Sequence, residues 1–404
     1  MSRIRPRQRA TDCNYFHTNK NVPLNELTSK SAKILTFYFS KIPFNICRET
    51  HESVTVFEIL PNEIICGICE YLYALDIYAA FYNLNSRFRQ LITNSSVLLN
   101  VNIGSMSKSE FSRYVENIIT PNQDRIRFIY LSNLYVVDLF FSPVKIASRF
   151  IRLEKLVFDN IKSKYLLNII RRLTSLTQLS SLTIMPIDEY RNHDEIYRSI
   201  LNLPALTYCK MNLKRRYDYS GNPTVRMLHV TSPLEEIVIL QALDYDDIIG
   251  LLACAPHLKR LDFNFSKCRD NLPAIDSTIA SLRLTHLTVD MGLTPFDHFE
   301  RITTNLLSHL QVLHISVKQN KKYLDANRWE QLISSSMPHL RIFDLNYSYH
   351  IYGIYTEWNL ADCNETLRKF SSLFWAQHKW YFEYQLAVKD YEGEMWFFSV
   401  NPYR

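Results

Sequence analysis

The stretch that decides the fold is Leu258-Lys259-Arg260-Leu261-Asp262-Phe263. It consists of an apolar residue, two others, an apolar residue, one other and an apolar residue, and the chain contains nine copies of this phrase. The copies begin at residues 126, 153, 179, 206, 234, 258, 284, 310 and 340, at intervals of 24 to 30 residues. A period of this size indicates stacked repeats, each of which forms one structural unit.

The phrase and its period are those of a leucine-rich repeat. Most copies are followed by a stretch with apolar residues at helical spacing. These stretches are Tyr165–Leu173, Asp194–Leu203, Asp246–Leu252, Phe299–Leu307 and Trp329–Ser334. We therefore expect an α/β fold, a leucine-rich-repeat solenoid with a parallel sheet on its inner side and helices on its outer side.

In the last four copies, polar residues occupy the positions between and just after the three apolar residues of the phrase, which we call its letters. Successive side chains of a strand point to opposite faces, so these positions face the inner, concave side. The expected patch consists of Arg260, Asp262, Asn264, His286, Asp290, His314, Asp344 and Asn346. Tyr208 and Lys210 are candidates to extend it.

This patch has three interpretations. It binds a protein target, it is a solvated sheet surface, or His286, Asp262, Asp290 and His314 perform catalysis. Catalysis needs groups held in a site that excludes water, which an open sheet face does not offer. We therefore expect no catalytic residues and no enzyme activity, and the first two interpretations stay open.

The composition also argues against cofactors and metals. None of the seven glycines lies in a phosphate-binding, dinucleotide-binding or nucleophile-elbow motif. Cys66 and Cys69 form a CxxC pair without a second pair, and a structural zinc site needs four ligands. We expect no metal and no cofactor.

Charge and hydropathy bear on location. Residues 1–52 carry nine Lys/Arg and four Asp/Glu, so they hold +5 of the net charge of +6 and leave about +1 for the rest. The folded part lacks the basic footprint of a nucleic-acid-binding domain, and no apolar run is long enough to span a membrane. Scattered cysteines without a secretory signal suit a reducing compartment, so we expect a cytoplasmic or nuclear protein. Residues 1–53 read as a basic, mostly disordered tail.

Residues 54–100 predict a small domain of three helices. The first carries Phe57 to Leu72 at helical spacing, with Pro61 near its start. We expect Asp76 to cap the second helix and Ser86 to cap the third. One interpretation of this domain is a cover for the open end of the repeats.

The same residues resemble an F-box. The matching positions are Leu60-Pro61-Asn62-Glu63-Ile64, followed by Ile68, Leu72, Asp76, Ala80, Leu84, Asn85, Phe88, Leu91 and Ile92. The resemblance implies docking to a Skp-type linker protein of a cullin-RING ubiquitin ligase. The residues that it implies for this docking are Leu60, Pro61, Ile64, Ile68, Leu72 and Phe88. Such a site would leave apolar side chains exposed, whereas a cover would bury them.

The repeats are expected to span residues 101–362 and to be closed by residues 363–404. An aromatic stretch within residues 347–362 is predicted to be an exposed loop. Beyond it we expect a helix, Glu365–Ala376, and a hairpin of Trp380–Val388 with Met395–Val400. Trp375, Trp380, Trp396 and Phe397 are expected to cover the last repeat.

Together these features resemble the F-box and leucine-rich-repeat proteins. The resemblance implies a substrate-recognition adaptor of a Skp-cullin-F-box (SCF) ubiquitin ligase, whose repeats bind a protein target. The alternative is a leucine-rich-repeat scaffold or binding protein with no link to a ligase.

Overall fold

A computed structural model describes residues 60–104, 106–132, 149–189, 193–213, 231–265, 283–352, 360–389 and 392–400. The fold is α/β, with helices and a large, mostly parallel sheet of 12 strands. The chain divides into two compact units, residues 1–100 and residues 101–404. The predicted basic tail, residues 1–53, lies outside the described residues.

The first unit contains three short helices, α2 (Asn62–Cys69), α3 (Ala74–Phe81) and α4 (Ser86–Thr93). Their apolar faces meet in a core where the rings of Phe81 and Phe88 stack at 5.5 Å. The core side chains are Ile65, Cys69, Leu72, Ala74, Ile77, Phe81, Phe88 and Ile92. The guanidinium of Arg87 donates to the carbonyl of Leu60 at 2.6 Å, which ties α4 to the start of α2.

The predicted caps of two helices are wrong, by three residues in α3 and by one residue in α4. Helix α3 begins at Ala74, after Tyr73, so Asp76 lies in its first turn and not at its cap. Helix α4 is capped by Asn85, whose side chain accepts a hydrogen bond from the Phe88 amide at 3.0 Å. Ser86, the predicted cap, is the first residue inside the helix.

The strands follow one another through the sheet in chain order as far as β10. They are β1 (Leu99–Ile103), β2 (Ile126–Leu131), β3 (Lys155–Ile161), β4 (Ser181–Pro186), β5 (Tyr208–Met211), β6 (Glu236–Leu243), β7 (Arg260–Phe265), β8 (His286–Gly292), β9 (Val312–Lys318) and β10 (Ile342–Tyr352). From β2 to β10 every neighbouring pair is parallel. The sequence did not predict β1, whose residues span the boundary at residue 100 along the chain.

The register aligns the repeated phrase from strand to strand. Leu261 pairs with Ile237 on one side and with Leu287 on the other, and these are the second apolar letters of three copies. The third letters pair in the same way, as Phe263 does with Val289. All nine copies have all three apolar letters buried. The sequence prediction of these strands is therefore confirmed.

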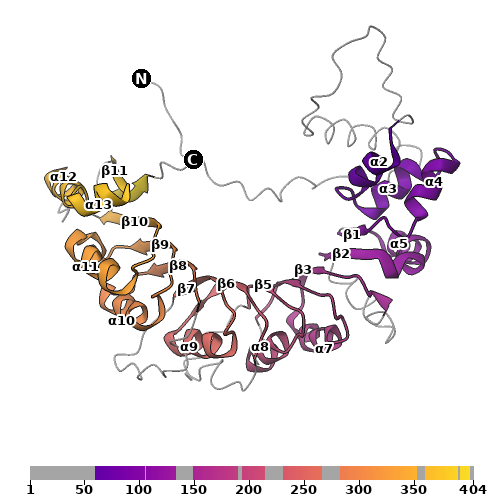
Figure 1. Cartoon of the computed structure of the whole chain (residues 1–404), viewed down its shortest axis with the longest axis horizontal. Helices are drawn as coiled ribbons and strands as arrows, with labels where there is room; N and C mark the ends of the chain where they lie inside the picture. Colours follow the sequence, from indigo (N-terminus) through magenta and orange to yellow (C-terminus); the bar gives the residue numbers. More distant parts are fainter. Residues whose placement is uncertain are drawn as a thin grey trace, which may run out of the picture. The chain divides into compact units, whose positions relative to one another are not determined.

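Helices lie between the strands along the chain. They are α5 (Lys108–Tyr114), α7 (Ser163–Leu173), α8 (His193–Leu201), α9 (Tyr245–Cys254), α10 (Phe296–Leu306) and α11 (Ala326–Ser336). Short π and 3-10 segments follow α5, at Val115–Ile119 and Thr120–Arg125, and precede α11, at Lys321–Leu324. Figure 1 shows α7 to α11 on one face of the sheet. We call the other face, on which the described residues of the second unit place no helix, the open face.

The C-terminal part extends the sheet. Helices α12 (Leu360–Lys369) and α13 (Leu373–His378) precede the hairpin of β11 (Tyr381–Lys389) and β12 (Glu392–Val400). The predicted hairpin is thus present, and the single predicted helix is divided in two. The rings of Trp375 and Trp380 lie 5.8 and 5.7 Å from that of Phe343 in β10, so they cover the last repeat.

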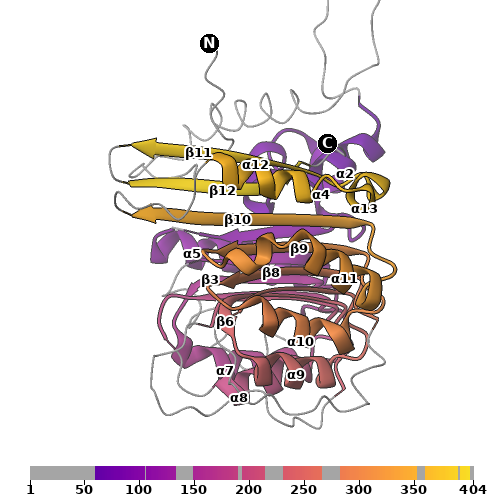
Figure 2. The same cartoon turned by 90° about the vertical axis from the view of Figure 1, so that its left-hand side faces the viewer.

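The predicted loop of residues 347–362 is wrong at residues 347–352, which form a strand, and residues 353–359 lie outside the described residues. Strand β10 continues to Tyr352 and pairs antiparallel with β12, from Asn346 with Phe398 to Tyr352 with Glu392. Figure 2 shows β10, β12 and β11 side by side as long strands. Tyr347, predicted to be exposed, is buried. The extension is stable because β12 supplies backbone partners beyond the end of β9.

Candidate functional site

The eight residues predicted for the inner face lie on four neighbouring strands, in three rows across the open face. Arg260 pairs with His286 in the first row. The second row runs from Asp262 through Thr288 and His314 to Asp344. The third row runs from Asn264 through Asp290 and Ser316 to Asn346. We call these eight predicted residues the polar patch, and the structure brings them together as the sequence indicated.

An ion pair closes the second row. His314 Nδ1 lies 2.6 Å from Asp344 Oδ2, and both side chains are partly exposed. The other carboxylate oxygen, Oδ1, accepts a hydrogen bond from Ser399 Oγ at 3.3 Å. Ser399 belongs to β12, and its Oγ also accepts from the Leu345 amide at 3.1 Å. The C-terminal hairpin therefore helps to position Asp344.

Asp262 lies half-buried among opposing charges. Burial raises the pKa of its carboxyl, the positive charges of Lys210 and His314 lower it, and the negative charge of Glu236 raises it. Lys210 and Glu236 are therefore close enough to Asp262 to act on it. They extend the charged surface from β7 toward β5 and β6.

His286 lies close to the charges of Arg260 and His314. Burial lowers the pKa of its imidazole, and the charges of Arg260 and His314 lower it further. Its Nδ1 forms a hydrogen bond with the Thr285 hydroxyl at 2.9 Å. A lowered pKa favours the neutral ring, which offers one donor and one acceptor to a partner.

Two members of the third row are bonded to the backbone. Asn264 Nδ2 donates to the Leu240 carbonyl at 2.7 Å, and Asp290 Oδ1 accepts from the Gly292 amide at 2.9 Å. Both hydrogen bonds lie where the register between neighbouring strands shifts, at residues 239–242 of β6 and at residues 290–292 of β8. Asn346, on β10, is exposed.

The contacts of Asp344 bear on the catalytic interpretation. In a catalytic triad the serine binds the imidazole, which then removes its proton. Here Ser399 and His314 both bind oxygens of the same carboxylate, so this contact does not activate the hydroxyl. Within the described residues, no group of three or more His, Cys, Asp or Glu side chains is arranged to hold a metal ion. The arrangement offers donors, acceptors and both signs of charge to a ligand on the surface.

Sequence reasoning missed the residues that the hairpin adds. Ser399 is one, and Glu394 is another, since its Oε1 lies 2.9 Å from His350 Nδ1. Both depend on the pairing of β12 with β10, which joins residues from 40 apart, as in Tyr352 and Glu392, to 52 apart, as in Asn346 and Phe398. The alternation of apolar and polar residues from Tyr347 to Tyr352 was a usable signal for the longer strand.

The first unit exposes apolar side chains around α2. Pro61 and Ile64 are exposed and Leu60 and Ile68 are half-buried, as the F-box resemblance implies. Leu72 and Phe88 are corrected: they are 4% and 0% exposed, because they face the helix core. Other exposed apolar side chains of this unit are Tyr71, Tyr73, Leu75, Tyr82 and Leu84. We call Leu60, Pro61, Ile64 and Ile68, together with these five, the apolar set.

Comparison with known proteins gives no family. No protein-family model matches the sequence, and no curated protein matches it. Among the described residues, no helix is long and apolar enough to cross a membrane.

Proposed function

We propose that this chain is the substrate-recognition adaptor of an SCF-type ubiquitin ligase. In this proposal the first unit is an F-box that binds a Skp-type linker protein, and the cullin ligase core follows through that linker. The second unit is a leucine-rich-repeat solenoid whose open face binds the protein to be modified. The adaptor itself performs no chemistry and acts by bringing its target close to the ligase, in the cytoplasm or the nucleus.

The observation that carries the proposal is the apolar set. Ile64 is 49%, Tyr71 78% and Leu75 44% exposed on a unit of only three short helices. Exposed apolar side chains gathered on one small unit indicate a protein-binding surface. A unit that served only to cover the repeats would have buried them, which favours the F-box interpretation.

The second unit supports the other half of the proposal. Its open face holds ordered side chains of both charges on nine aligned strands, and the described residues offer no enclosed site there. Repeat proteins use such extended faces to bind other proteins. The strand register and the helix after most copies of the phrase support the solenoid interpretation.

The test is co-purification of the full chain with a Skp-type linker and a cullin. The variant Ile64→Glu/Leu75→Glu should lose both partners, because charge at the centre of an apolar interface costs about 2 kcal/mol or more at each site. The matched control is Leu373→Glu, since Leu373 is 74% exposed in the second unit. It should retain both partners.

The alternative is a scaffold without ligase association. It predicts that the intact chain never co-purifies with a linker or a cullin, while it still retains target proteins. Retention of linker and cullin by the Ile64→Glu/Leu75→Glu variant would contradict the assignment of the apolar set.

A further inference from the structure

Strand β12 places two aromatic side chains on the open face of the C-terminal hairpin. Met395 and Phe397 of this strand are buried, and the Phe397 ring lies 4.9 Å from that of Phe370, at the end of α12. Trp396 and Phe398 alternate with these residues, so they point to the opposite side of the sheet, where both are partly exposed. Trp396, predicted to cover the last repeat, therefore lies on the open face instead.

The strand register places two glutamates beside the Trp396 indole. Strands β10, β12 and β11 lie side by side (Figure 2), and Trp396 pairs with Gln385 of β11 while Phe398 pairs with Glu383. Glu383 is therefore a diagonal neighbour of Trp396, at about 7–8 Å. Glu394 lies two residues before Trp396 on the same face of β12, at about 7 Å. The ring thus has a carboxylate on two sides.

Both carboxylates can still bind a ligand. Glu383 is exposed, and among the described residues its side chain takes part in no hydrogen bond or ion pair. Glu394 is 41% exposed, and His350 Nδ1 lies 2.9 Å from its Oε1, which leaves Oε2 for another partner. The exposed cation Lys318 lies two strands from Trp396, at about 10 Å. The immediate surroundings of the ring are therefore acidic.

The two aromatic rings are also open to a ligand. Among the described residues, neither Trp396 nor Phe398 takes part in a ring contact or a cation–π contact. On the other side of the same strand, the ring of Phe397 contacts both Phe370 and Phe382. A partly exposed tryptophan next to an apolar ring, with polar side chains around them, has the composition of the centre of a protein-binding surface.

An aromatic face between carboxylates favours a cation, and arginine in particular. The ring attracts a cation placed over its face, and tryptophan does so more strongly than the other aromatic side chains. A guanidinium can stack on an indole while the N–H groups in its plane donate to carboxylates at its edges. An ammonium is a compact charge and lacks this planar fork. A phosphate or an acidic peptide would be repelled by Glu383 and Glu394.

We propose that the open face of the C-terminal hairpin binds an arginine-containing segment of a partner protein, with the guanidinium stacked on Trp396. Glu383 and Glu394 then accept hydrogen bonds from the guanidinium, and Phe398 contacts a neighbouring apolar side chain. Because Phe398 pairs with Asn346 of the polar patch, a segment bound to the patch also reaches the hairpin. The inference rests on the proposed role of the open face in target binding and names the chemistry that the target would carry.

The test measures peptide binding to the full chain by fluorescence anisotropy. The probes are labelled pools of short peptides with degenerate, uncharged flanks around a fixed pair of residues, which is Arg-Leu, citrulline-Leu or Glu-Leu. Citrulline has nearly the shape of arginine without its charge. The Arg-Leu pool should bind tighter than the citrulline-Leu pool by about fivefold or more, through one cation–π contact and two exposed ion pairs. Added salt should weaken this preference.

Two variants separate the carboxylates from the ring. Glu383→Gln/Glu394→Gln keeps the length of both side chains and should remove most of the preference for arginine. Trp396→Leu keeps an apolar side chain without an aromatic face and should reduce the preference by about two- to fivefold. Urea unfolding checks that both variants fold.

Matched controls come from outside the hairpin. Phe128 of β2 is a partly exposed ring of the open face, and Lys155 Nζ lies 5.5 Å from its centre, so a cation already occupies it. Phe128→Leu should keep the preference for arginine. Glu116→Gln/Glu330→Gln removes the same charge as the hairpin double variant, from the segment after α5 and from α11, and should also keep it.

Four outcomes would overturn the inference. These are equal affinity for the Arg-Leu and citrulline-Leu pools, an unchanged preference in either hairpin variant, tighter binding of the Glu-Leu pool than of the Arg-Leu pool, and displacement of the Arg-Leu pool by spermine at a lower concentration than by unlabelled peptide. The last would assign the site to free polyamines. None of these measurements involves the linker or the cullin, so failure of this site is distinguishable from failure of the adaptor proposal.

Discussion

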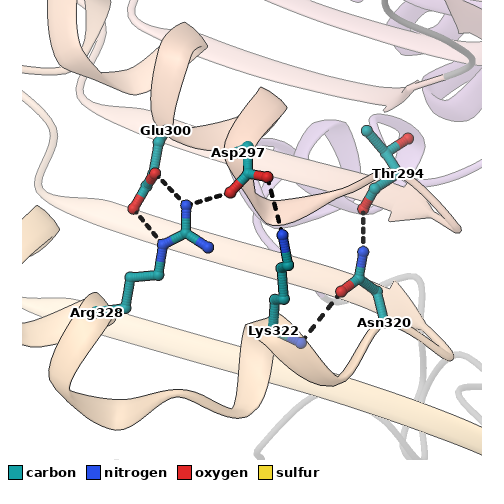
Figure 3. A network of polar contacts seen from close by, with 6 residues as sticks. All are labelled: Thr294, Asp297, Glu300, Asn320, Lys322 and Arg328. Carbon is teal, nitrogen blue, oxygen red and sulfur yellow. Dashed lines mark hydrogen bonds and ion pairs between the residues drawn. The ribbon is translucent and has the colours of Figure 1, made fainter.

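Arg328 of α11 holds Glu300 of α10 across two neighbouring helices. The Arg328 Nε donates to Glu300 Oε1 at 2.8 Å, and an Nη of the same guanidinium reaches both Glu300 and Asp297 (Figure 3). The guanidinium also lies 4.5 Å from the centre of the Phe296 ring. The two helices follow β8 and β9, so this contact joins successive repeats on the helical face.

Arg328→Ala should lower the free energy of unfolding by about 1–2 kcal/mol, because two carboxylates lose a partly buried partner. Arg171, which pairs with Glu195 between α7 and α8, is a more exposed control, at 57% against 25% for Arg328. Arg171→Ala should cost less than about 1 kcal/mol. Urea unfolding of the three proteins measures the difference, and equal losses would contradict the importance assigned to Arg328.

The contribution of Arg328 should also depend on pH. Hydrogen bonds from Arg328 and Lys322 lower the pKa of Asp297. Because the pKa of Asp297 is lower in the folded state, its ionised carboxylate stabilises the protein at pH above its unfolded pKa, about 3.9. This contribution is lost as pH falls through the folded-state pKa. The stability gap between the native chain and Arg328→Ala should therefore narrow below about pH 4. If this difference in the free energy of unfolding became larger on acidification, the pKa of Asp297 would not be lowered by Arg328.

Phe88 should stabilise the first unit as part of its apolar core. Phe88→Ala removes a ring that is 0% exposed and stacked on Phe81, and it should cost about 3–5 kcal/mol. Hydrogen exchange of residues 60–100 should then accelerate throughout α2, α3 and α4. Ile64→Glu changes an exposed side chain and should leave exchange as it is. If exchange were equally slow in both variants, Phe88 would not be a core residue.

Asp262 should titrate above the usual range of an aspartate. Burial on the open face raises the pKa of its carboxyl more than Lys210 and His314 lower it. Because the folded-state pKa of Asp262 is raised, the contribution of this one group to the stability is most favourable below the unfolded pKa, about 3.9. That contribution is lost as pH rises through the folded-state pKa. Asp262→Asn should therefore gain stability relative to the native chain toward neutral pH. NMR titration of the carboxyl carbon measures the pKa directly, and a value below the usual one would contradict the burial argument.

The repeated phrase predicted the sheet well because its information is local. Each copy carries three buried apolar letters. Because the copies are of similar length, stacking them pairs the equivalent letters of neighbouring strands. Leu261 and Phe263 pair with the equivalent letters of both neighbouring strands as the period implies. The polar patch follows from the same alternation, so it was predicted residue by residue.

Features that depend on distant pairing were not predicted. The extension of β10 requires pairing with β12, and the residues around Tyr347 do not indicate which distant segment will pair with them. Exposure was also ambiguous for Leu72, in the turn between α2 and α3, and for Phe88, in α4. The family pattern marks both as important, but it does not separate a residue that contacts a partner from one that holds the helices together. Their burial depends on side-chain packing, which a spacing pattern does not contain.

Cys209 should be protected from alkylation while the sheet is folded. It occupies the second letter of its copy in β5, pairs with Leu182 and Ile237, and is fully buried. Burial raises the pKa of its thiol to about 12, and only the thiolate reacts. Iodoacetamide near neutral pH should label Cys209 in urea and not in water, as mass spectrometry can follow. Cys66, which is half-buried, should label faster in the native chain. Rapid native labelling of Cys209 would contradict its place between the two strands.

The open face, and not the helical face, should contact the target. A photo-crosslinking amino acid at Asn346, which is exposed beside Asp344, should capture a target in cells. The same group at Gln331, which is exposed on α11, is the matched control and should capture far less. Asp344→Ala should reduce capture at Asn346 without changing the co-purification of the linker, because it removes the partner of His314 and leaves the apolar set intact. If both positions captured the same proteins equally, the polar patch would be a solvated surface, and the second interpretation of its charges would hold.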